Sequence, residues 1–447
     1  MKLPQTNNSK GQILLSIVIS MAIFAILSST LFTLISSSYS LITYNKARIT
    51  GRYLAQEKME IIRNMPYEDI GTSGGIPNGN LLQEEKITKN GLVYTIKTSI
   101  IYIDDPYDDI APLDTSPEDY KRVRVEASWE GLAASKKNPV VLLTDVSAYA
   151  TGVIEGGTLI VSVTDSNNNP VSQAEVQITA TSTTPPVDTK PKTDSSGKVI
   201  LPGSPPCVSC YQITVTKLGY SSDRTYSTGE VANPIKSHTS VFEDDVTQIS
   251  FQVDKLGSIS ISSFDSRENN FNPLGNVAFR LHGNKIIGTD AYAQPVYKYD
   301  ENLSTNESGN LTLNNMEWDV YHILMLSSSS YDISGTTPLT PFYLSPEGNS
   351  QEDFCVTSHT TNSFFITIKD SSSSLIASAT ARLYDDSGFE NIKTSGIEDN
   401  PDFGQLLFSN LNEKTFHLEA TASGFINYLN DFDVSGSSKA DVILQTE

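Results

Sequence analysis

The chain is poor in the residues from which metal centres, disulfide scaffolds and catalytic triads are built. Its 447 residues include three cysteines and five histidines. Three cysteines are too few for a disulfide scaffold, and no nucleophile motif accompanies the histidines. The histidines are scattered rather than set at metal-ligand spacing: they are His238, His282, His322, His359 and His417. We therefore expect no catalytic residue, no metal site and no cofactor.

Basic residues are scarce relative to acidic ones. Lys and Arg total 31 against 52 Asp and Glu, which gives a formal net charge of −21 and a pI near 4.6. Contact with phosphates requires clustered Lys and Arg, so this balance argues against a nucleic-acid partner. A strong negative charge suits a soluble surface that resists self-association. The length requires three or more domains.

Long apolar runs are lacking except for one near the N-terminus. Residues 13–35 are 23 consecutive positions without a charge, and about 20 apolar residues span a bilayer as a helix. A secretory signal peptide is one alternative, but its apolar region is usually about 7–15 residues long. An ordinary single-span anchor is another. The run predicts a transmembrane segment at 13–35.

The apolar run continues into an amphipathic segment. A single helix from Ile13 to Met65 is expected, about 80 Å long at roughly 1.5 Å per residue. Pro66 ends it, because the proline ring excludes the preceding helical turn. A stripe on the second half is expected to pack on a globular head. The stripe comprises Tyr44, Ala47, Gly51, Leu54, Ile61 and Met65, with Lys58 interrupting its spacing.

A short polar leader ending in Lys10-Gly11-Gln12 precedes this helix. Leader and helix together resemble the N-terminus of type IV prepilins and pseudopilins. The resemblance implies that a prepilin peptidase cuts between Gly11 and Gln12 and methylates the new N-terminus at Gln12. The family usually has Glu at the fifth mature position, where this chain has Ser16. That departure favours a minor or tip subunit, whose implied partners are other pilin or pseudopilin subunits bound through the helix.

Two further segments resemble minor pilins of the modification-protein type. One is Gly51–Tyr67, and the other is Tyr120–Trp129, which opens with Tyr-Lys, carries valines and ends in Trp. With strands expected at Leu92–Ile103 and Val140–Tyr149, they predict a small antiparallel sheet against the helix, a pilin-like α+β head. Trp129 is expected in the core of that head rather than at a ligand site.

Behind the head, short alternating strands and turn signals recur three times. Strands and turns of this kind build β-sandwiches. In the first unit, Thr193-Asp194-Ser195-Ser196-Gly197 and its flanking strands resemble a carboxypeptidase regulatory-like, transthyretin-like sandwich. In relatives such domains are spacers, stabilisers or binding modules. The second unit holds a long insertion, Gly288–Asn302, and its tyrosines form either a binding loop or a surface loop that packs on itself. These are Tyr292, Tyr297 and Tyr299.

Three local patterns imitate metal or redox sites. Cys207 and Cys210 form a CxxC that favours a local disulfide, because zinc would need a second pair and only Cys355 remains. The run from Asp165 to Asn169 imitates the start of a calcium loop, but Pro170 replaces the required Gly, so turn chemistry explains the run. The acidic loop 104–109 is expected to be solvated rather than to bind Ca²⁺.

The expected fold is α+β in the N-terminal part, with a long transmembrane helix and a small antiparallel sheet, followed by three all-β sandwiches of transthyretin or immunoglobulin type. The expected segments are a leader (1–11), the helix (12–65), the head (66–152) and sandwiches at 157–254, 257–358 and 362–447.

The predicted function is a non-enzymatic, membrane-anchored minor or tip subunit of a type IV pilus or a type II secretion-like filament. It would pass from the cytoplasmic membrane to a surface filament and display the sandwiches outside the cell, where they could bind a surface ligand or mediate adhesion. The alternative is a cell-surface β-repeat protein with an ordinary N-terminal anchor that does not polymerise.

Overall fold

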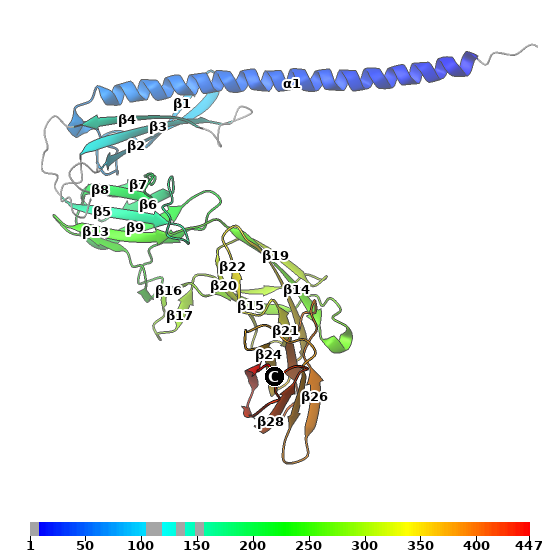
Figure 1. The fold of residues 1–447 in the computed structure, drawn as a ribbon. Coiled ribbons are helices and arrows are strands. Elements are labelled where there is room, and N and C mark those ends of the chain that lie inside the picture. The colour runs from blue at the N-terminus through cyan, green and yellow to red at the C-terminus, as the bar shows by residue number, and fades with distance from the viewer. Residues whose placement is uncertain (1–8, 104–118, 131–138, 148–155) are drawn as a thin grey trace, which may run out of the picture.

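One long helix leads the molecule. The computed structural model describes residues 9–103, 119–130, 139–147 and 156–447, with helix side chains described from residue 18 onward. Helix α1 runs from Ser9 to Arg63, 55 residues, and Figure 1 shows it projecting far beyond the sheets. It begins before the expected Ile13, because Lys10-Gly11-Gln12 contains no proline to prevent a helical turn. It ends just before Pro66, which disfavours helical geometry in the residue ahead of it.

The second half of α1 packs on a four-stranded antiparallel sheet of order β1-β2-β3-β4, and together they form the head. The strands are β1 (Glu84–Lys89), β2 (Leu92–Ile103), β3 (Tyr120–Trp129) and β4 (Val140–Ser147), with a short 3-10 helix η1 (Tyr67–Asp69) after α1. Every second residue of β3 is buried, from Lys121 to Trp129, as expected for a sheet with one face against a core.

One residue of the stripe expected from the sequence lies outside the buried stripe of α1, and Ala55, Met59 and Ile62 are buried in addition. Ile61 is 52% exposed, whereas Ile62 is fully buried. The helical angle explains the correction: counted from the fully buried Ala55 at about 100° per residue, Met59 and Ile62 lie within about 40°, whereas Ile61 lies about 120° away. Lys58 does not interrupt the stripe, because it lies at the border of the contact and pairs with Glu85 of β1.

Three sandwiches follow the head and are here named unit 1 (residues 156–254), unit 2 (257–358) and unit 3 (362–447). The strands of unit 1 are β5 (Gly157–Thr164), β6 (Glu175–Ala180), β7 (Val187–Thr189), β8 (Lys198–Ser204), β9 (Cys207–Thr216), β10 (Asp223–Arg224), β11 (Asn233–Pro234), β12 (Thr239–Val241) and β13 (Val246–Gln252).

Units 2 and 3 have similar strand sets. Those of unit 2 are β14 (Gly257–Asp265), β15 (Ala278–Gly283), β16 (Ile286–Thr289), β17 (Pro295–Tyr297), β18 (Asp300–Ser304), β19 (Asn310–Met316), β20 (Asp319–Met325), β21 (Tyr331–Thr337), β22 (Phe342–Leu344) and β23 (Asn349–Ser358), with the 3-10 helix η2 (Arg267–Asn269). Those of unit 3 are β24 (Ser363–Asp370), β25 (Thr380–Tyr384), β26 (Glu390–Thr394), β27 (Gln405–Phe408), β28 (Lys414–Thr421), β29 (Tyr428–Val434) and β30 (Ser437–Leu444).

The three units share one topology. In each, the first strand pairs antiparallel with a later strand and parallel with the last: β5 with β8 and β13, β14 with β19 and β23, β24 with β27 and β30. The second strand of each unit is central in the facing sheet. Each unit encloses its own apolar core. The long helix and the sandwiches confirm the fold class expected from the sequence.

The hairpins and corners of the sandwiches repeat one turn device. A side-chain Oδ1 accepts hydrogen bonds from the main-chain N–H groups two and four residues later, at 2.7–2.9 Å. The acceptors are Asp165, Asp194, Asp290, Asn306, Asp370 and Asp385. Such Asx turns replace main-chain pairing with a short side chain. The run at Asp165 is therefore a turn, as its sequence indicates.

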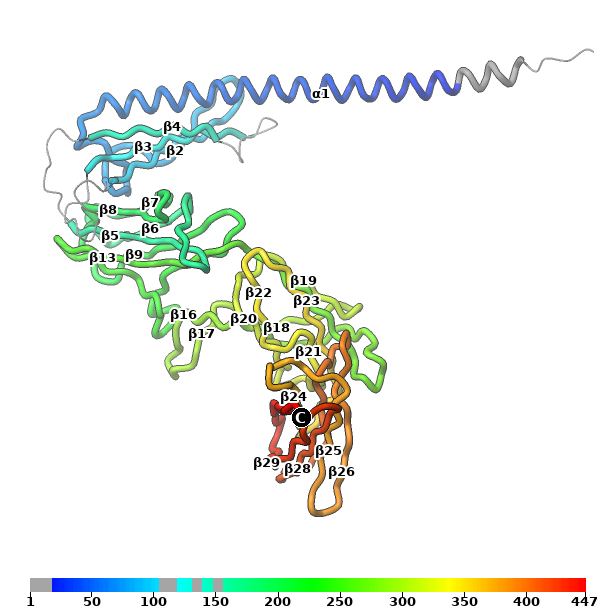
Figure 2. Tube along the Cα trace, viewed as in Figure 1, coloured from blue at the N-terminus to red at the C-terminus, as the bar shows by residue number. Residues whose placement is uncertain are grey.

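The insertion of unit 2 is a β-hairpin rather than an irregular loop. Its strand β16 pairs with β11 of unit 1, Asn233 opposite Thr289, so the three-stranded sheet β11-β16-β17 bridges the two units. The Tyr297 ring packs against the His282 ring, with centroids 4.5 Å apart, whereas Tyr292 is 85% exposed. Figure 2 shows this hairpin lying between the two sandwiches. The insertion joins the units instead of only packing on itself.

An acidic side chain lies inside unit 2. Glu352 on β23 is 2% exposed and accepts a hydrogen bond from Ser350 at 2.5 Å. Burial raises the pKa of its carboxyl from 4.5 to about 8, since removing a charge from water favours the protonated form. Because the folded state holds this proton more tightly than the unfolded state, unit 2 should lose stability as the pH rises from about 4.5 to 8.

Replacing Glu352 by Gln should remove this pH dependence. The variant is expected to match the wild type near pH 4.5 and to exceed it by roughly 2–4 kcal/mol above pH 8. Hydrogen exchange of the β14 and β23 amides across this range would measure the difference. The exposed Glu307 provides the matched control, because a Gln there should leave the pH slope unchanged. Equal slopes for wild type and Glu352→Gln would contradict the prediction.

Candidate functional site: the exposed apolar helix and its attachment

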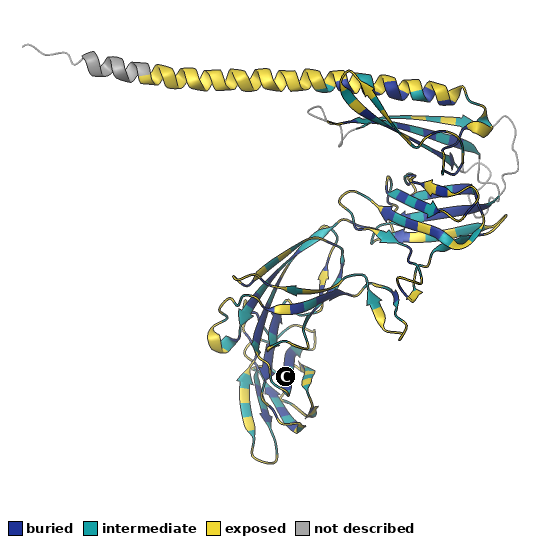
Figure 3. Ribbon diagram, turned by 180° about the vertical axis from the view of Figure 1, so that it is seen from behind, coloured by how far each residue is buried: buried dark blue, intermediate teal, exposed yellow. Residues whose placement is uncertain are grey.

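The first half of α1 is an uncovered apolar surface. From Val18 to Ile42 its large side chains are about half to three-quarters exposed, Phe32 at 75% and Phe24 at 72%. Figure 3 shows this half of the helix exposed on all sides, whereas the second half is buried along one face. The helix is long and apolar enough to cross a membrane, judged by its length and composition. An apolar surface this large requires lipid or protein cover.

The residues singled out for processing lie at the start of this helix. Gly11, Gln12 and Ser16 all belong to α1, but their side chains lie outside the described residues. Their position is at the far end from the head, away from all three sandwiches (Figure 1).

Trp129 attaches the helix to the head. Its side chain is 1% exposed and packs between Tyr44 of α1 and Tyr94 of β2, with ring centroids 5.9 and 6.0 Å away. Gly51 makes room for it, because a Cβ at that position would lie 3.2 Å from the indole ring. Trp129 is thus a core residue, as the sequence indicates, and its aromatic cluster is one part of the contact between helix and sheet.

A buried lysine secures the turn that follows the helix. Lys121 is 2% exposed, and its amino group donates hydrogen bonds of 2.8 Å to the carbonyls of Tyr67 and Ile70. The amine also lies 4.3 Å from the centre of the Tyr67 ring. Burial lowers the pKa of Lys121 to about 8, although Glu68 and Asp69 oppose the shift. Its place in the alternating run of β3 is the sequence signal that identifies it as inward-facing.

The CxxC lies at the start of β9, far from the helix. Cys207 and Cys210 are joined as a disulfide with their Cα atoms 6.0 Å apart. The N–H of Ser209, inside this loop, donates to the Ser240 hydroxyl of the neighbouring strand segment at 2.8 Å. Cys355 is free and buried in unit 2, where burial raises the pKa of its thiol to about 12. Among the described residues no group of three or more His, Cys, Asp or Glu gathers as a metal site. The acidic loop 104–109 lies outside the described residues.

The head and unit 1 contact each other through polar and apolar groups. Glu126 of β3 pairs with Arg124 of the same strand and with Lys192 of unit 1, the latter at 3.0 Å, and the N–H of Asp188 donates to the Gly74 carbonyl at 2.7 Å. Ile76 and Ile101 of the head pack on the apolar core of unit 1. These contacts orient the two domains. They place the sandwiches on the side of the head sheet that faces away from the helix (Figure 1).

Comparison with solved structures finds proteins of low sequence identity to this chain. The Bacillus anthracis TIE protein is 12% identical over 82% of this chain and 73% of its own, with a TM-score of 0.20. A Streptococcal ancillary pilin is 14% identical over 66% of this chain and 99% of its own, with a TM-score of 0.18. BcpA, the major pilin subunit of Bacillus cereus, is 11% identical over 65% and 100%, with a TM-score of 0.16. Scores this low support no argument from superposition.

A search of curated proteins finds no match to the chain. Residues 158–251 match the family model of the carboxypeptidase regulatory-like domain. The matched segment runs from β5 almost to the end of β13, and these strands build the sandwich described above. Unit 1 is thus the part of the chain that matches the carboxypeptidase regulatory-like domain.

Proposed function

We propose that this chain is a membrane-anchored, prepilin-type minor subunit of a type IV pilus or a related secretion filament, without catalytic activity. The first half of α1 would sit in the cytoplasmic membrane before assembly and among like helices afterwards. The head would rest on that helix, and the three sandwiches would extend outside the cell. Prepilin peptidase and other pilin or pseudopilin subunits would be its partners.

The observation that carries the proposal is the division of α1 into an exposed apolar half and a half packed on the head. Burial of the exposed half against lipid or other helices would supply the driving force for insertion and assembly. A helix that only anchored a surface protein would need no leader ending in Lys10-Gly11 and no rigid attachment through Trp129. Ser16, in place of the usual Glu at the fifth mature position, supports a minor or tip position.

Display of the sandwiches for adhesion is a second part of the proposal. The arrangement in Figure 1 supports it, because unit 3 lies at the end of the molecule remote from α1. Long β-repeat stalks hold a terminal domain away from the membrane, where a surface ligand can be reached.

Processing at Gly11 provides the test. In its native membrane, the wild-type chain should begin at a methylated Gln12, having lost the first eleven residues. Gly11→Val should retain the whole leader, because a branched side chain would stand at the scissile bond. Intact mass and N-terminal sequencing would measure both. Gln5→Val, a similar change remote from that bond, is the control and should be processed normally.

Two results would overturn the proposal. A wild-type chain beginning at Met1 would leave a surface β-repeat protein with an ordinary anchor that does not polymerise. A chain cut well beyond residue 35 would leave a secreted protein. Either result would exclude a role in a filament, independently of what the sandwiches bind.

A further inference from the structure

Units 2 and 3 are fixed to each other at one end of their contact. The carboxylate of Asp402 accepts hydrogen bonds from the Arg267 guanidinium across the interface, 2.8 Å from Nε, and Asp402 is 5% exposed. Beside this pair, the fully buried Gln405 of β27 reaches β21 of unit 2. Polar groups that are buried and mutually paired define a single docking geometry.

Gln405 bonds to the main chain of β21 as a neighbouring strand would. Its Oε1 accepts from the N–H of Thr336 at 3.0 Å, and its Nε2 donates to the carbonyl of the same residue at 2.7 Å. Strand β21 lies at the edge of its sheet, whose order is β19-β14-β23-β21. The side chain therefore occupies one position of an otherwise unpaired strand edge, and that edge faces unit 3.

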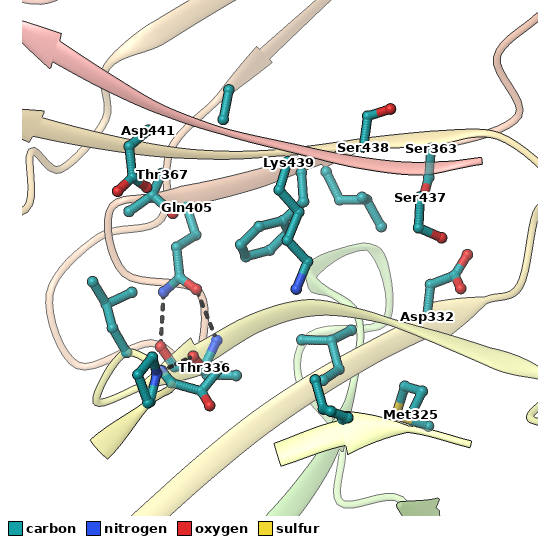
Figure 4. Close-up of a pocket in the computed structure, with 18 of the residues that line it drawn as sticks. Met325, Asp332, Thr336, Ser363, Thr367, Gln405, Ser437, Ser438, Lys439 and Asp441 are labelled. Atoms are coloured by element: carbon teal, nitrogen blue, oxygen red, sulfur yellow. Dashed lines mark hydrogen bonds between the residues drawn. The ribbon is translucent and has the colours of Figure 1, made fainter. Parts of the chain in front are cut away.

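Away from Gln405 the two units separate and leave a cleft of about 640 Å³. Asp332 and Ile333 of the β21 edge line one wall, with Met325 behind them. The outward face of β24 and β27 lines the other wall with Phe365 and Leu407. Figure 4 shows Gln405 and Thr336 closing one end, with Asp332 and Ser437 at the opposite end. The volume lies in the range of about 300–1,000 Å³ that ligand sites occupy.

The cleft contains a lysine that no carboxylate of the described residues neutralises. The Lys439 amino group points into the cleft in Figure 4 and lies 5.9 Å from the centre of the Phe365 ring. The acidic groups around it are already engaged. Asp441 pairs with Lys369 at 2.9 Å, and Asp332 pairs with His359 at 2.8 Å.

We infer that this cleft binds an extended peptide segment of a partner protein, which adds as a strand to the free edge of β21. Its main chain would continue the pairing that Gln405 begins at Thr336. Side chains on one face of the added strand would contact Phe365 and Leu407, and an acidic one among them would pair with Lys439. Strand addition of this kind takes its affinity from main-chain hydrogen bonds and its specificity from alternate side chains. The inference does not depend on processing at Gly11.

The test uses the full chain in detergent micelles and an array of acetylated seven-residue peptides. Thr stands at the even positions, and the odd positions carry Val, Leu or Ile with one Glu. The peptides with Glu should bind, and replacing that Glu by Lys should weaken binding at least tenfold. Lys439→Glu should reverse the preference, so that the Lys peptide binds better. Lys89→Glu, an equal charge change on the exposed end of β1, should alter neither affinity.

Two further measurements separate strand addition from simple filling of an apolar pocket. N-methylation of the peptide N–H groups on one edge should abolish binding, whereas methylation of the alternate set should not, because only one edge pairs with β21. The bound peptide should slow hydrogen exchange at Ile333 and its neighbours and leave β1 unchanged.

Three results would overturn the inference. One is the absence of binding by every peptide at about 1 mM, the weak limit for a specific contact. A second is binding that ignores both N-methylation and Lys439→Glu. A third is competition by hexanoate at the same affinity, which would assign the cleft to a small apolar anion. None of these results bears on whether the chain is processed or assembled, so failure here leaves the proposed function standing.

Discussion

Replacing Trp129 by alanine is expected to detach the second half of α1 from the head. The indole ring is 1% exposed and lies between Tyr44 and Tyr94, so its removal leaves a cavity within the contact between helix and sheet. Substitutions of this kind cost about 3–5 kcal/mol. Denaturant unfolding of the full chain in micelles, followed by hydrogen exchange of the β2 and β3 amides, would measure the loss.

Trp318 of unit 2 provides the matched control. It is half-buried, and Lys285 lies over its ring. Trp318→Ala should change exchange in unit 2 and leave β2 and β3 as they were. Equal protection of the head amides in wild type and Trp129→Ala would contradict the assignment of Trp129 as the attachment point.

Arg267→Met is expected to have the second large effect, at the interface between units 2 and 3. The substitution leaves the Asp402 carboxylate buried without its counter-ion, and breaking such a pair costs about 3–5 kcal/mol. Burial already raises the pKa of Asp402 even with Arg267 lowering it, so loss of Arg267 raises it further. The folded variant then binds a proton more readily than the unfolded chain, and its stability falls as the pH rises.

The destabilisation by Arg267→Met should therefore be largest at neutral pH and small near pH 4. Hydrogen exchange of β21 and β27 at both pH values would test this. Arg280→Met removes a pair with Asp300 whose side chains are each more than a third exposed, and it should cost about 1 kcal/mol or less. An equal cost for Arg267→Met at both pH values would show that Asp402 is not held charged by Arg267.

The larger features of the fold were predicted from patterns among residues that are close together in the sequence. The charge-free run at 13–35, the stop at Pro66 and the alternation in β3 each depend on residues adjacent in the chain, and each reappears in the structure. Ile61 was misplaced because Ile61 and Ile62 are both apolar, and one-turn spacing does not decide which faces the sheet. The helical angle counted from the fully buried Ala55 decides it, because Ile62 lies about 20° from Ala55 and Ile61 about 120°.

The features that sequence reasoning missed are made by residues far apart in the chain. Gln405 bonds to Thr336 and Arg267 to Asp402 across more than 60 and 130 positions respectively, and no local pattern marks either pair. The sheet β11-β16-β17, which bridges units 1 and 2, is made of strands that are each only two to four residues long. Such contacts depend on how the domains dock. No pattern of residues that are close together in the sequence specifies this docking.

The pairing of first and last strands in every unit has a mechanical consequence. Because β5 and β13 run parallel and side by side, as do β14 and β23 and β24 and β30, the chain enters each sandwich at one end and leaves at the other. A pull between the membrane helix and a ligand held by unit 3 would load each parallel pair along its length. All the hydrogen bonds of a pair would then be loaded together in shear instead of opening one at a time. The row of three sandwiches would therefore resist extension.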